Sequence, residues 1–488
     1  MTAFDIIRAA GAEPCRPWPR HILPLPAWQD MTAALADDTA TLLGLWADTI
    51  QVHALFRDGS DVLAASVAVE GGSYPALSPA RPAAALFERM IRDLWGHAAV
   101  GGRDDRSWLD HGRWPLAQPL SPRPGLPGGA VEPPEFVTVD EPGAMQLPLG
   151  PIHGAIGEPA HLRLTVRGEQ VLRAEARLGY AHKGTLALMR GKSPRTAARF
   201  VARLAAEATV AHSLAFARAT EAALGAEAPP RAAALRTLMA EQERIAGHLD
   251  EIGQMADAAG LAPLHVVAGR ERERLLRAAE HAFGHRLMMD VVVPGGVAAD
   301  IAPEGAAAIG QALDSVAAAL PALRRRMDPL LARLDRAGVI RGADAGGIVG
   351  RAGGRGFDAR SLDPAYGALG LVPPMDHAGD AAARCRLRLA EIAGSLRMLR
   401  ALLPALPDGP LSVALPAESG EGIGCAESLR GAAWHWLRLD HGQIAAAFPC
   451  DPGWALWPLA EAAIAGGPEE DAAMIRLSCG LPVSGLDL

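Results

Sequence analysis

Histidine and glutamate side chains gather between residues 150 and 216 of the chain. Imidazole binds metals and transfers protons near neutral pH, and a carboxylate acts as an acid or base when its surroundings shift its pKa. The spacing therefore predicts the frame of a polar cavity. The candidates to line it are His153, His161, His182, Glu207 and His212, with Arg351 from further along the chain.

Thiols, the ligands that soft metals prefer, are scattered. The sequence has no C-x-x-C word and no histidine–cysteine cluster with zinc-like spacing. Isolated cysteines of this kind are typical of small apolar side chains packed in a reducing compartment. The five cysteines are Cys15, Cys385, Cys425, Cys450 and Cys479.

Several short words in the same stretch resemble one protein family. The resemblance is to the large subunits of membrane-bound [NiFe] hydrogenases and to the quinone-pocket subunit of respiratory complex I. The words are Gly150-Pro151-x-His153, Glu158-Pro159-x-His161, Arg167-Gly168-Glu169, Gly179-Tyr180-x-His182-Lys183-Gly184 and Ala211-His212-Ser213.

Further words extend the resemblance to about residue 365. Each also has a structural interpretation, since Pro294-Gly295-Gly296 predicts a turn and Arg351 with Asp358 predicts a buried ion pair. We expect structural roles for all of them. They are Glu241-x-x-Arg244, His248, Arg270-Glu271-Arg272-Glu273, Gly284-x-Arg286, Pro294-Gly295-Gly296-Val297, Val349-Gly350-Arg351-Ala352-Gly353 and Asp358-x-Arg360.

The resemblance implies four cysteine ligands for nickel, in one pair before the A-H-S word and one near the C-terminus. The matched positions are Ala205, Ala208, Val483 and Leu486. None of these side chains offers a lone pair, whereas nickel in such a site needs soft thiolates. We therefore expect no bound metal at these positions.

A quinone site is the alternative that the resemblance leaves open. In the complex I relatives a tyrosine of an R-L-D-Y word meets the quinone, but the chain has Ala206 at that place. Loss of this hydroxyl removes a proton donor. We expect a structural core of an oxidoreductase complex that binds no cofactor directly, with a quinone-reducing subunit that has a rebuilt site as the alternative.

Residues 1–117 contain a second resemblance, in Phe87-Glu88-Arg89-x-x-x-Asp93-x-x-Gly96. It is similar to the small hydrophilic complex I subunit that packs against the quinone-pocket subunit. The other interpretation is an amphipathic helix with charge pairs on a solvated face. The resemblance favours contacts with partner subunits at Glu88, Arg89, Glu271 and Arg272.

Prolines and glycines between residues 118 and 150 predict a linker. It separates residues 1–117 from residues 151–488. The fold class expected is α+β, with a small N-terminal α+β domain followed by a large, mainly helical bundle domain with short peripheral sheets. Strands are expected at 49–56, 61–69, 161–166, 171–178, 423–428, 432–439 and 443–448, and helices from 82, 194, 230, 269, 303 and 376, with a last helix after Trp454.

Charge and hydropathy argue against two further classes of protein, nucleic-acid-binding and membrane-spanning proteins. A formal net charge of -8 argues against nucleic-acid binding, and no apolar run approaches the ~20 residues of a membrane helix. We expect a cytoplasmic protein that is peripheral on the cytoplasmic face of the inner membrane. The partners that the resemblance implies are a small subunit that carries an iron–sulfur cluster and antiporter-like membrane subunits.

Overall fold

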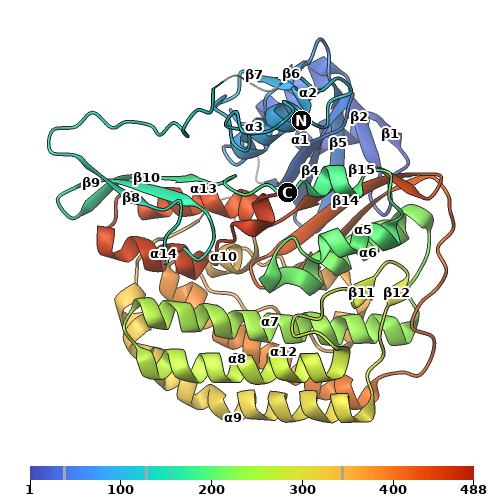
Figure 1. The fold of residues 1–488 in the computed structure, drawn as a ribbon, viewed down its shortest axis with the longest axis vertical. Coiled ribbons are helices and arrows are strands. Elements are labelled where there is room, and N and C mark those ends of the chain that lie inside the picture. Colours follow the sequence, from blue (N-terminus) through green and yellow to red (C-terminus); the bar gives the residue numbers. More distant parts are fainter. Residues whose placement is uncertain (37–39, 127–129, 155, 342–345) are drawn as a thin grey trace.

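The computed structural model describes residues 1–36, 40–126, 130–154, 156–341 and 346–488. Figure 1 shows an N-terminal layer above a set of long parallel-lying helices, with sheets between them. Helices and small sheets coexist, so the predicted α+β class is confirmed. Pro127, which the predicted linker includes, lies outside the described residues.

The N-terminal layer is a five-stranded sheet of order β1-β2-β5-β4-β3. The predicted strand pair is confirmed as an antiparallel hairpin that turns at Gly59, a residue with φ of 55°. The elements are α1 (Ala3–Ala9), β1 (Gly11–Glu13), β2 (Arg20–Leu23), α2 (Leu25–Leu35), β3 (Thr41–Ala47), β4 (Gln51–Asp58), β5 (Asp61–Ala68), β6 (Ser73–Pro75), α3 (Ala84–Trp95) and β7 (Ala98–Val100).

Helix α3 carries the word that suggested a partner surface, but its charges serve this chain. Glu88 accepts the N–H groups of Leu77 and Ser78 at 2.6 and 2.9 Å. Arg89 donates to the carbonyls of Arg106 and Ser107, both at 2.7 Å. Glu88 and Arg89 are buried. The solvated helix face therefore does not apply to them, because these buried charges bind the loops around α3, and their contact with a partner stays a prediction.

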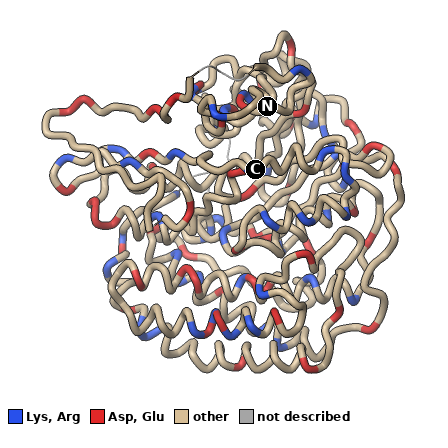
Figure 2. The backbone as a smooth tube through the Cα atoms, in the orientation of Figure 1, with Lys and Arg blue, Asp and Glu red and all other residues tan. Residues whose placement is uncertain are grey.

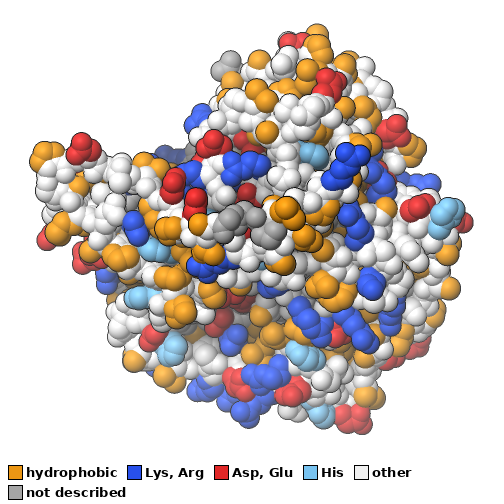
Figure 3. All heavy atoms as spheres, turned by 45° about the horizontal axis from the view of Figure 1, so that its top comes forward, with side chains coloured by type: hydrophobic (Ala, Val, Ile, Leu, Met, Phe, Trp, Pro, Cys, Tyr) orange, Lys and Arg blue, Asp and Glu red, His pale blue; other side chains and the backbone are white. Residues whose placement is uncertain are grey.

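The predicted linker is only partly structureless. Its end forms β8 (Met145–Leu149), which pairs with β9 (His161–Arg167), and β9 pairs with β10 (Gln170–Arg177). Residues 130–144, which precede this sheet, are named the strap. The sheet and the strap form an arm that projects on the left of Figures 1 and 3. Phe136 of the strap lies 4.0 Å from the Arg163 guanidinium, which attaches the strap to β9. The boundaries at 117 and 150 stay predictions.

Long helices form the lower layer of Figure 1. Helix α7 (Pro230–Ala258) packs on α8 (Ala262–Phe283), α8 on α9 (Pro303–Leu334), and α12 (Ala381–Leu402) on both α7 and α9. The sequence placed the start of α8 seven residues too late and that of α12 five too early. Basic and acidic residues alternate in α8 over residues 270–274 (Figure 2).

One helix of the described ranges, α9, has the length and composition of a membrane span, with a mean hydropathy of 1.4 over its most apolar window. The expectation of no such segment therefore needs qualifying. The apolar side of α9 is used within the bundle, because Ile309, Leu313 and Leu323 are buried in the same cluster as α8 and α12. Helices in the core of soluble proteins meet the same criterion.

A three-stranded sheet connects the two layers. Strands β13 (Gly420–Glu427), β14 (Ala432–Asp440) and β15 (Gln443–Cys450) confirm the three predicted C-terminal strands. Helix α6 (Thr209–Leu224) crosses one face at very short range. Cβ atoms at Gly420, Gly422 and Gly424 would lie within 2.3 Å of the α6 backbone, so only glycine fits there.

The other face of this sheet packs on the N-terminal layer. Trp46 lies 5.6 Å from Trp436 and stacks on Phe448, and Arg20 pairs with Glu421 at 2.6 Å. One continuous hydrophobic cluster contains residues of both regions. Residues 1–117 thus pack as a layer on the rest of the chain.

The remaining elements surround the site described next. The sequence predicted one helix after Trp454, whereas the structure has two, α13 and α14. The elements are α4 (Thr185–Met189), α5 (Pro194–Val201), β11 (Val292–Val293), β12 (Gly296–Val297), α10 (Gly347–Ala352), α11 (Pro364–Ala368), α13 (Gly453–Ile464) and α14 (Ala472–Cys479), with 3₁₀ turns at Ala206–Ala208 and Ser484–Leu486 among others.

Candidate functional site

The two segments that match the family's ligand pairs lie next to each other. Ala205 precedes and Ala208 ends the 3₁₀ turn before α6, and Val483 precedes and Leu486 ends the last 3₁₀ turn. All four side chains are buried. Lys183 joins the segments, because its Nζ donates to the carbonyl oxygens of Leu204 and Ser484, each at 2.6 Å.

Residues before α4 hold the C-terminal segment in place. The Glu158 carboxylate accepts the N–H groups of Val483 and Ser484 at 2.9 and 3.1 Å. The backbone N–H of Lys183 donates to Asp487 O at 3.1 Å, and that of Thr185 to Leu488 O at 2.9 Å. Residues 481–488 are therefore buried along most of their length.

The residues at this place do not fit a nickel–iron centre. Ala205, Ala208, Val483 and Leu486 supply no sulfur, and a lysine ammonium donates to both segments. Across the described ranges, no group of three or more His, Cys, Asp or Glu residues could hold a metal ion. An ammonium also repels a metal cation at short distance.

A polar cavity of about 380 Å³ opens beside the two segments, and we name it the internal cavity. Arg430 reaches Glu251 at 3.4 Å and Glu207 at 3.7 Å, but its Nε and Nη1 make no hydrogen bond to the described residues. Such buried, unsatisfied donors favour water or a polar ligand. The cavity is lined by Gly154, Ile156, Gly157, Glu158, Glu207, Glu251, Gln254, Arg430, Arg476, Leu477, Gly480 and Leu481.

Further charged side chains lie behind this cavity, toward the interior of the helix bundle. Glu251 pairs with Arg388 at 2.6 Å, and burial raises the pKa of Glu251 in spite of that arginine and Arg430. Arg388 in turn lies 3.2 Å from the Nδ1 atom of His248. Contacts between charged side chains thus connect the wall of the internal cavity with the interior of the bundle.

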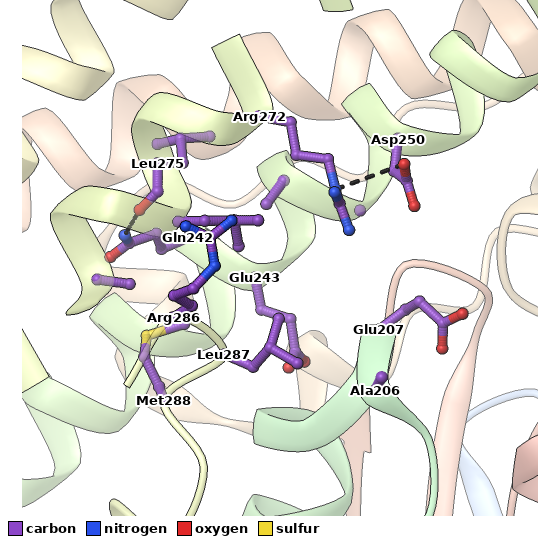
Figure 4. Close-up of a pocket in the computed structure, with 14 residues that line it drawn as sticks. Ala206, Glu207, Gln242, Glu243, Asp250, Arg272, Leu275, Arg286, Leu287 and Met288 are labelled. Atoms are coloured by element: carbon purple, nitrogen blue, oxygen red, sulfur yellow. Dashed lines mark hydrogen bonds and ion pairs between the residues drawn. The ribbon is translucent and has the colours of Figure 1, made fainter. Parts of the chain in front are cut away.

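A second, smaller pocket of about 80 Å³ lies between α7 and α8 (Figure 4). Glu243 points toward its centre and accepts the N–H groups of Val210 and Ala211 at 2.6 and 3.0 Å. Burial raises the pKa of Glu243 to about 8. Arg272 and Asp250, 3.4 Å apart, lie at its rim, and Glu207 is the one described residue that lines both this pocket and the internal cavity.

The predicted cavity residues separate in space. Glu207 lines the internal cavity, whereas His153 is exposed on a loop and His161 packs 4.6 Å from Phe136. The His182 ring lies 4.5 Å from Trp114, and burial lowers its pKa. Of the six candidates, only Glu207 lines the internal cavity.

His212 belongs to a buried structural cluster. Its Nδ1 lies 3.0 Å from His435 Nε2, and its Nε2 lies 3.0 Å from the Asp451 carboxylate. All three residues are buried. Burial lowers the pKa of His435, and the cluster links α6, β14 and the turn before α13.

Arg351 belongs to what we name the buried network, in which each carboxylate pairs with a guanidinium. Arg351 contacts Glu391, Glu427 at 2.9 Å and Asp358 at 3.3 Å, as the sequence predicted for Asp358. Burial opposes ionisation of Glu391, but Arg351 and the other cations hold its pKa well below the usual value. The network comprises Glu241, Arg244, Arg351, Asp358, Arg360, Glu391 and Glu427.

The other two residues expected at a partner surface also have internal contacts. Glu271 is buried and accepts from Ser315 at 2.6 Å and from its helix neighbours Arg270 and Arg274. Arg272 alone of the four remains partly exposed, at the rim of the small pocket.

Sequence reasoning missed Arg430. The segment Glu418-Ser419-Gly420-Glu421-Gly422 resembles the family's E-x-P-R-G-E word but contains no arginine. Glu427-Ser428-Leu429-Arg430-Gly431 has the same glutamate–arginine–glycine spacing nine residues later. That repeated spacing was the available signal, and the turn between β13 and β14 directs Arg430 into the cavity.

Comparisons with known families agree with this architecture. Residues 183–250 match the family described as nickel-dependent hydrogenase, and residues 258–432 match the family described as respiratory-chain NADH dehydrogenase, 49 Kd subunit. Hydrogenase-4 component G of Escherichia coli is 30% identical over 460 residues, which cover 90% of this chain and 80% of the relative.

Two further similarities extend the range. The mitochondrial NADH-ubiquinone oxidoreductase 49 kDa subunit of Neurospora crassa is 32% identical over 279 residues, which cover 54% of this chain and 57% of the relative. A chain from the structure of a membrane-bound sulfane sulfur reductase, an archaeal respiratory membrane complex, superposes with a TM-score of 0.68. It is 23% identical, and the match covers 72% of this chain and 100% of that one, which shows a shared fold.

Proposed function

Because this chain belongs to the family of nickel–iron hydrogenase large subunits and complex I 49 kDa subunits, we propose that it is the structural core of a membrane-associated electron-transfer or ion-translocating complex. In this proposal it holds no nickel–iron centre. The observation that carries it is the set of side chains where the two ligand segments meet, Ala205, Ala208, Val483 and Leu486, with the Lys183 ammonium bonded to both segments.

The proposed partners follow from the relatives. Hydrogenase-4 and the sulfane sulfur reductase are multi-component assemblies by name, and the latter is a respiratory membrane complex. We therefore propose contacts with a small iron–sulfur subunit and with antiporter-like membrane subunits, at the cytoplasmic face of the inner membrane. Of the four residues predicted to face partners, Arg272 is the one whose side chain is partly exposed. Arg272→Glu should weaken co-purification of partners, and an unchanged yield of the complex would refute that contact.

Metal content tests the core of the proposal. Protein purified without oxygen from its native host should contain less than one-tenth of a nickel atom per chain by elemental analysis. One nickel per chain would overturn the proposal, since the ligands would have to come from other residues. A hydrogenase large subunit that retains its cysteines, prepared in the same way, is the positive control.

A quinone-reducing subunit is the second candidate, and the internal cavity favours it. Arg430 offers buried donors without hydrogen-bond partners, which suit a quinone oxygen. If the cavity turns over substrate, Arg430→Met in a fully assembled complex should lower its rate by roughly 10²-fold or more. If the chain is a structural core, the rate should stay within about twofold.

The matched control is His153→Ala, on the exposed loop outside the cavity. It should leave the rate unchanged under either candidate. His212→Ala is unsuitable, because the loss of its contacts with His435 and Asp451 would disturb packing.

A further inference from the structure

The Lys183 side chain links the two segments through two short hydrogen bonds. A lysine ammonium has three donors and no acceptor, and its hydrogen bonds are stronger than those of neutral donors. Two of these donors reach backbone carbonyls at 2.6 Å. The acceptors, Leu204 and Ser484, lie 280 residues apart in sequence and next to Ala205 and Val483.

The surroundings keep this ammonium in a defined position. Its own backbone N–H and that of Thr185 pair with Asp487 and Leu488, so the C-terminal segment contacts both the main chain and the side chain of Lys183. Burial lowers the pKa of Lys183, whereas Asp487 and Glu158 oppose that shift. Nearby carboxylates thus favour the charged form within a partly desolvated setting.

We propose that the Lys183 ammonium takes the mechanical place of a metal, as the cation that holds the C-terminal segment against the turn at Ala206–Ala208. These two segments are walls of the internal cavity, through Leu481 and Glu207 respectively. Lys183 therefore keeps the cavity closed on this side. The C-terminal segment docks without metal insertion, and neutralisation of one amine releases it.

The two hydrogen bonds from Lys183 to Leu204 and Ser484 are named the clamp. The comparison of Lys183 with a metal rests on the proposed function, whereas the clamp rests on these two bonds alone. A chain that contained nickel but protected Lys183 would refute the proposed function and leave the clamp standing. The two failures are therefore distinguishable when metal content and lysine reactivity are measured on the same sample.

Lysine reactivity gives a direct test, because the chain has only two lysines, Lys183 and Lys192. Lys192 is exposed and serves as the internal reference. The full-length protein is treated with an amine-reactive succinimidyl ester at neutral pH, and modification is followed by peptide mass spectrometry. We expect Lys183 to react roughly 100-fold more slowly than Lys192, because each charge-assisted bond suppresses the free amine about tenfold or more. Equal rates would refute the clamp.

Variants extend the test to the C-terminal segment. In Lys183→Met, amide hydrogen exchange at residues 181–186 and 481–488 should rise about tenfold or more, while α7 and α12 exchange as in wild type. Lys183→Arg should restore protection, since it keeps the charge and the donors. Lys192→Met is the matched control and should change nothing.

Unchanged protection of residues 481–488 in Lys183→Met would overturn the proposal. So would equal exchange in Lys183→Met and Lys183→Arg, because the charge would then have no part in docking. The lysine-reactivity comparison needs no variant, so it decides the question even if Lys183→Met fails to fold.

Discussion

The buried network and the internal cavity use the same residue types with opposite results. In the network, each carboxylate contacts at least one guanidinium, and Arg351 and Glu391 have no exposed side-chain surface. In the cavity, Arg430 and Glu251 are also buried, and Glu251 lies 2.6 Å from Arg388 and 3.4 Å from Arg430. The Arg430 Nε and Nη1 atoms, however, make no hydrogen bond to the described residues.

The difference separates structure from function. A buried ion pair is maintained when its partners also satisfy each other's hydrogen bonds, and such a group has no capacity left for a ligand. The network comes close to that condition, because Arg351 Nε is its one buried side-chain nitrogen or oxygen without a hydrogen bond to the described residues, and it fixes α7, α10, α12 and β13 relative to one another. The cavity does not meet it, which leaves room for water or substrate.

The largest expected effect is on the network. Arg351→Met should lower the free energy of unfolding by about 3–5 kcal/mol, because it leaves Glu391, Glu427 and Asp358 short of a cation. Denaturant titration measures it. The control is Arg386→Met, which breaks the exposed pair with Asp376 and should cost about 0–1 kcal/mol. Equal losses in the two variants would mean that the network contributes no more than a surface pair.

The next effect is a pH dependence. Burial lowers the pKa of His248 to about 4, against the hydrogen bond to Glu391. The unfolded chain, with a histidine pKa of about 6.5, binds this proton more readily. The stability that His248 contributes is therefore complete above pH 6.5 and is lost as pH falls toward 4, by up to about 3 kcal/mol.

His248→Gln should flatten that slope between pH 6.5 and 4. Urea titrations of wild type and variant at several pH values provide the measurement. A wild-type slope that survives in His248→Gln would assign the pH dependence to other histidines. A flattened slope would confirm that burial beside the network keeps the His248 ring from binding a second proton.

The smallest effect is expected in the cavity. Arg430→Met should change the free energy of unfolding by no more than about 1 kcal/mol, because water in a cavity of about 380 Å³ can solvate Glu207 and Glu251. Thermal unfolding of Arg430→Met and Arg351→Met side by side measures the contrast. A loss as large as that of Arg351→Met would place Arg430 in the structural class and remove the basis for a ligand site.

Local patterns predicted local structure well. The alternation around Gly59 and in β13–β15 located those strands, and Pro230 and Pro303 marked helix starts where a missing N–H costs nothing. Helix α14 was missed because the polar run Glu469–Asp471 and its short length hid the apolar periodicity. Strand β8 was missed because Pro148 is typical of a linker, although an edge strand tolerates proline.

The site was harder to predict, because it forms from distant segments. Glu207 was among the predicted cavity residues, but Glu251, Arg430 and Leu481 meet it only after α7, β13 and α14 pack. His212 and Arg351 are chemically suited to catalysis, and only burial with Asp451 and Glu391 shows that they are structural. The type of a residue indicates which chemistry its side chain can perform, while the residues that contact it within the fold decide whether that side chain is available for a ligand.

The contact between the N-terminal layer and β13 has a consequence for synthesis. Arg16 exchanges backbone hydrogen bonds with Glu421 and Ile423, and Arg20 pairs with Glu421, which follows it by 401 residues. A ribosome that adds 5–20 residues per second needs roughly 20–80 s to reach that partner. The N-terminal sheet can form early, but its Trp46 face must wait uncovered until β14 and β15 emerge. An apolar face that stays uncovered for that long during synthesis is the kind of surface that chaperones bind.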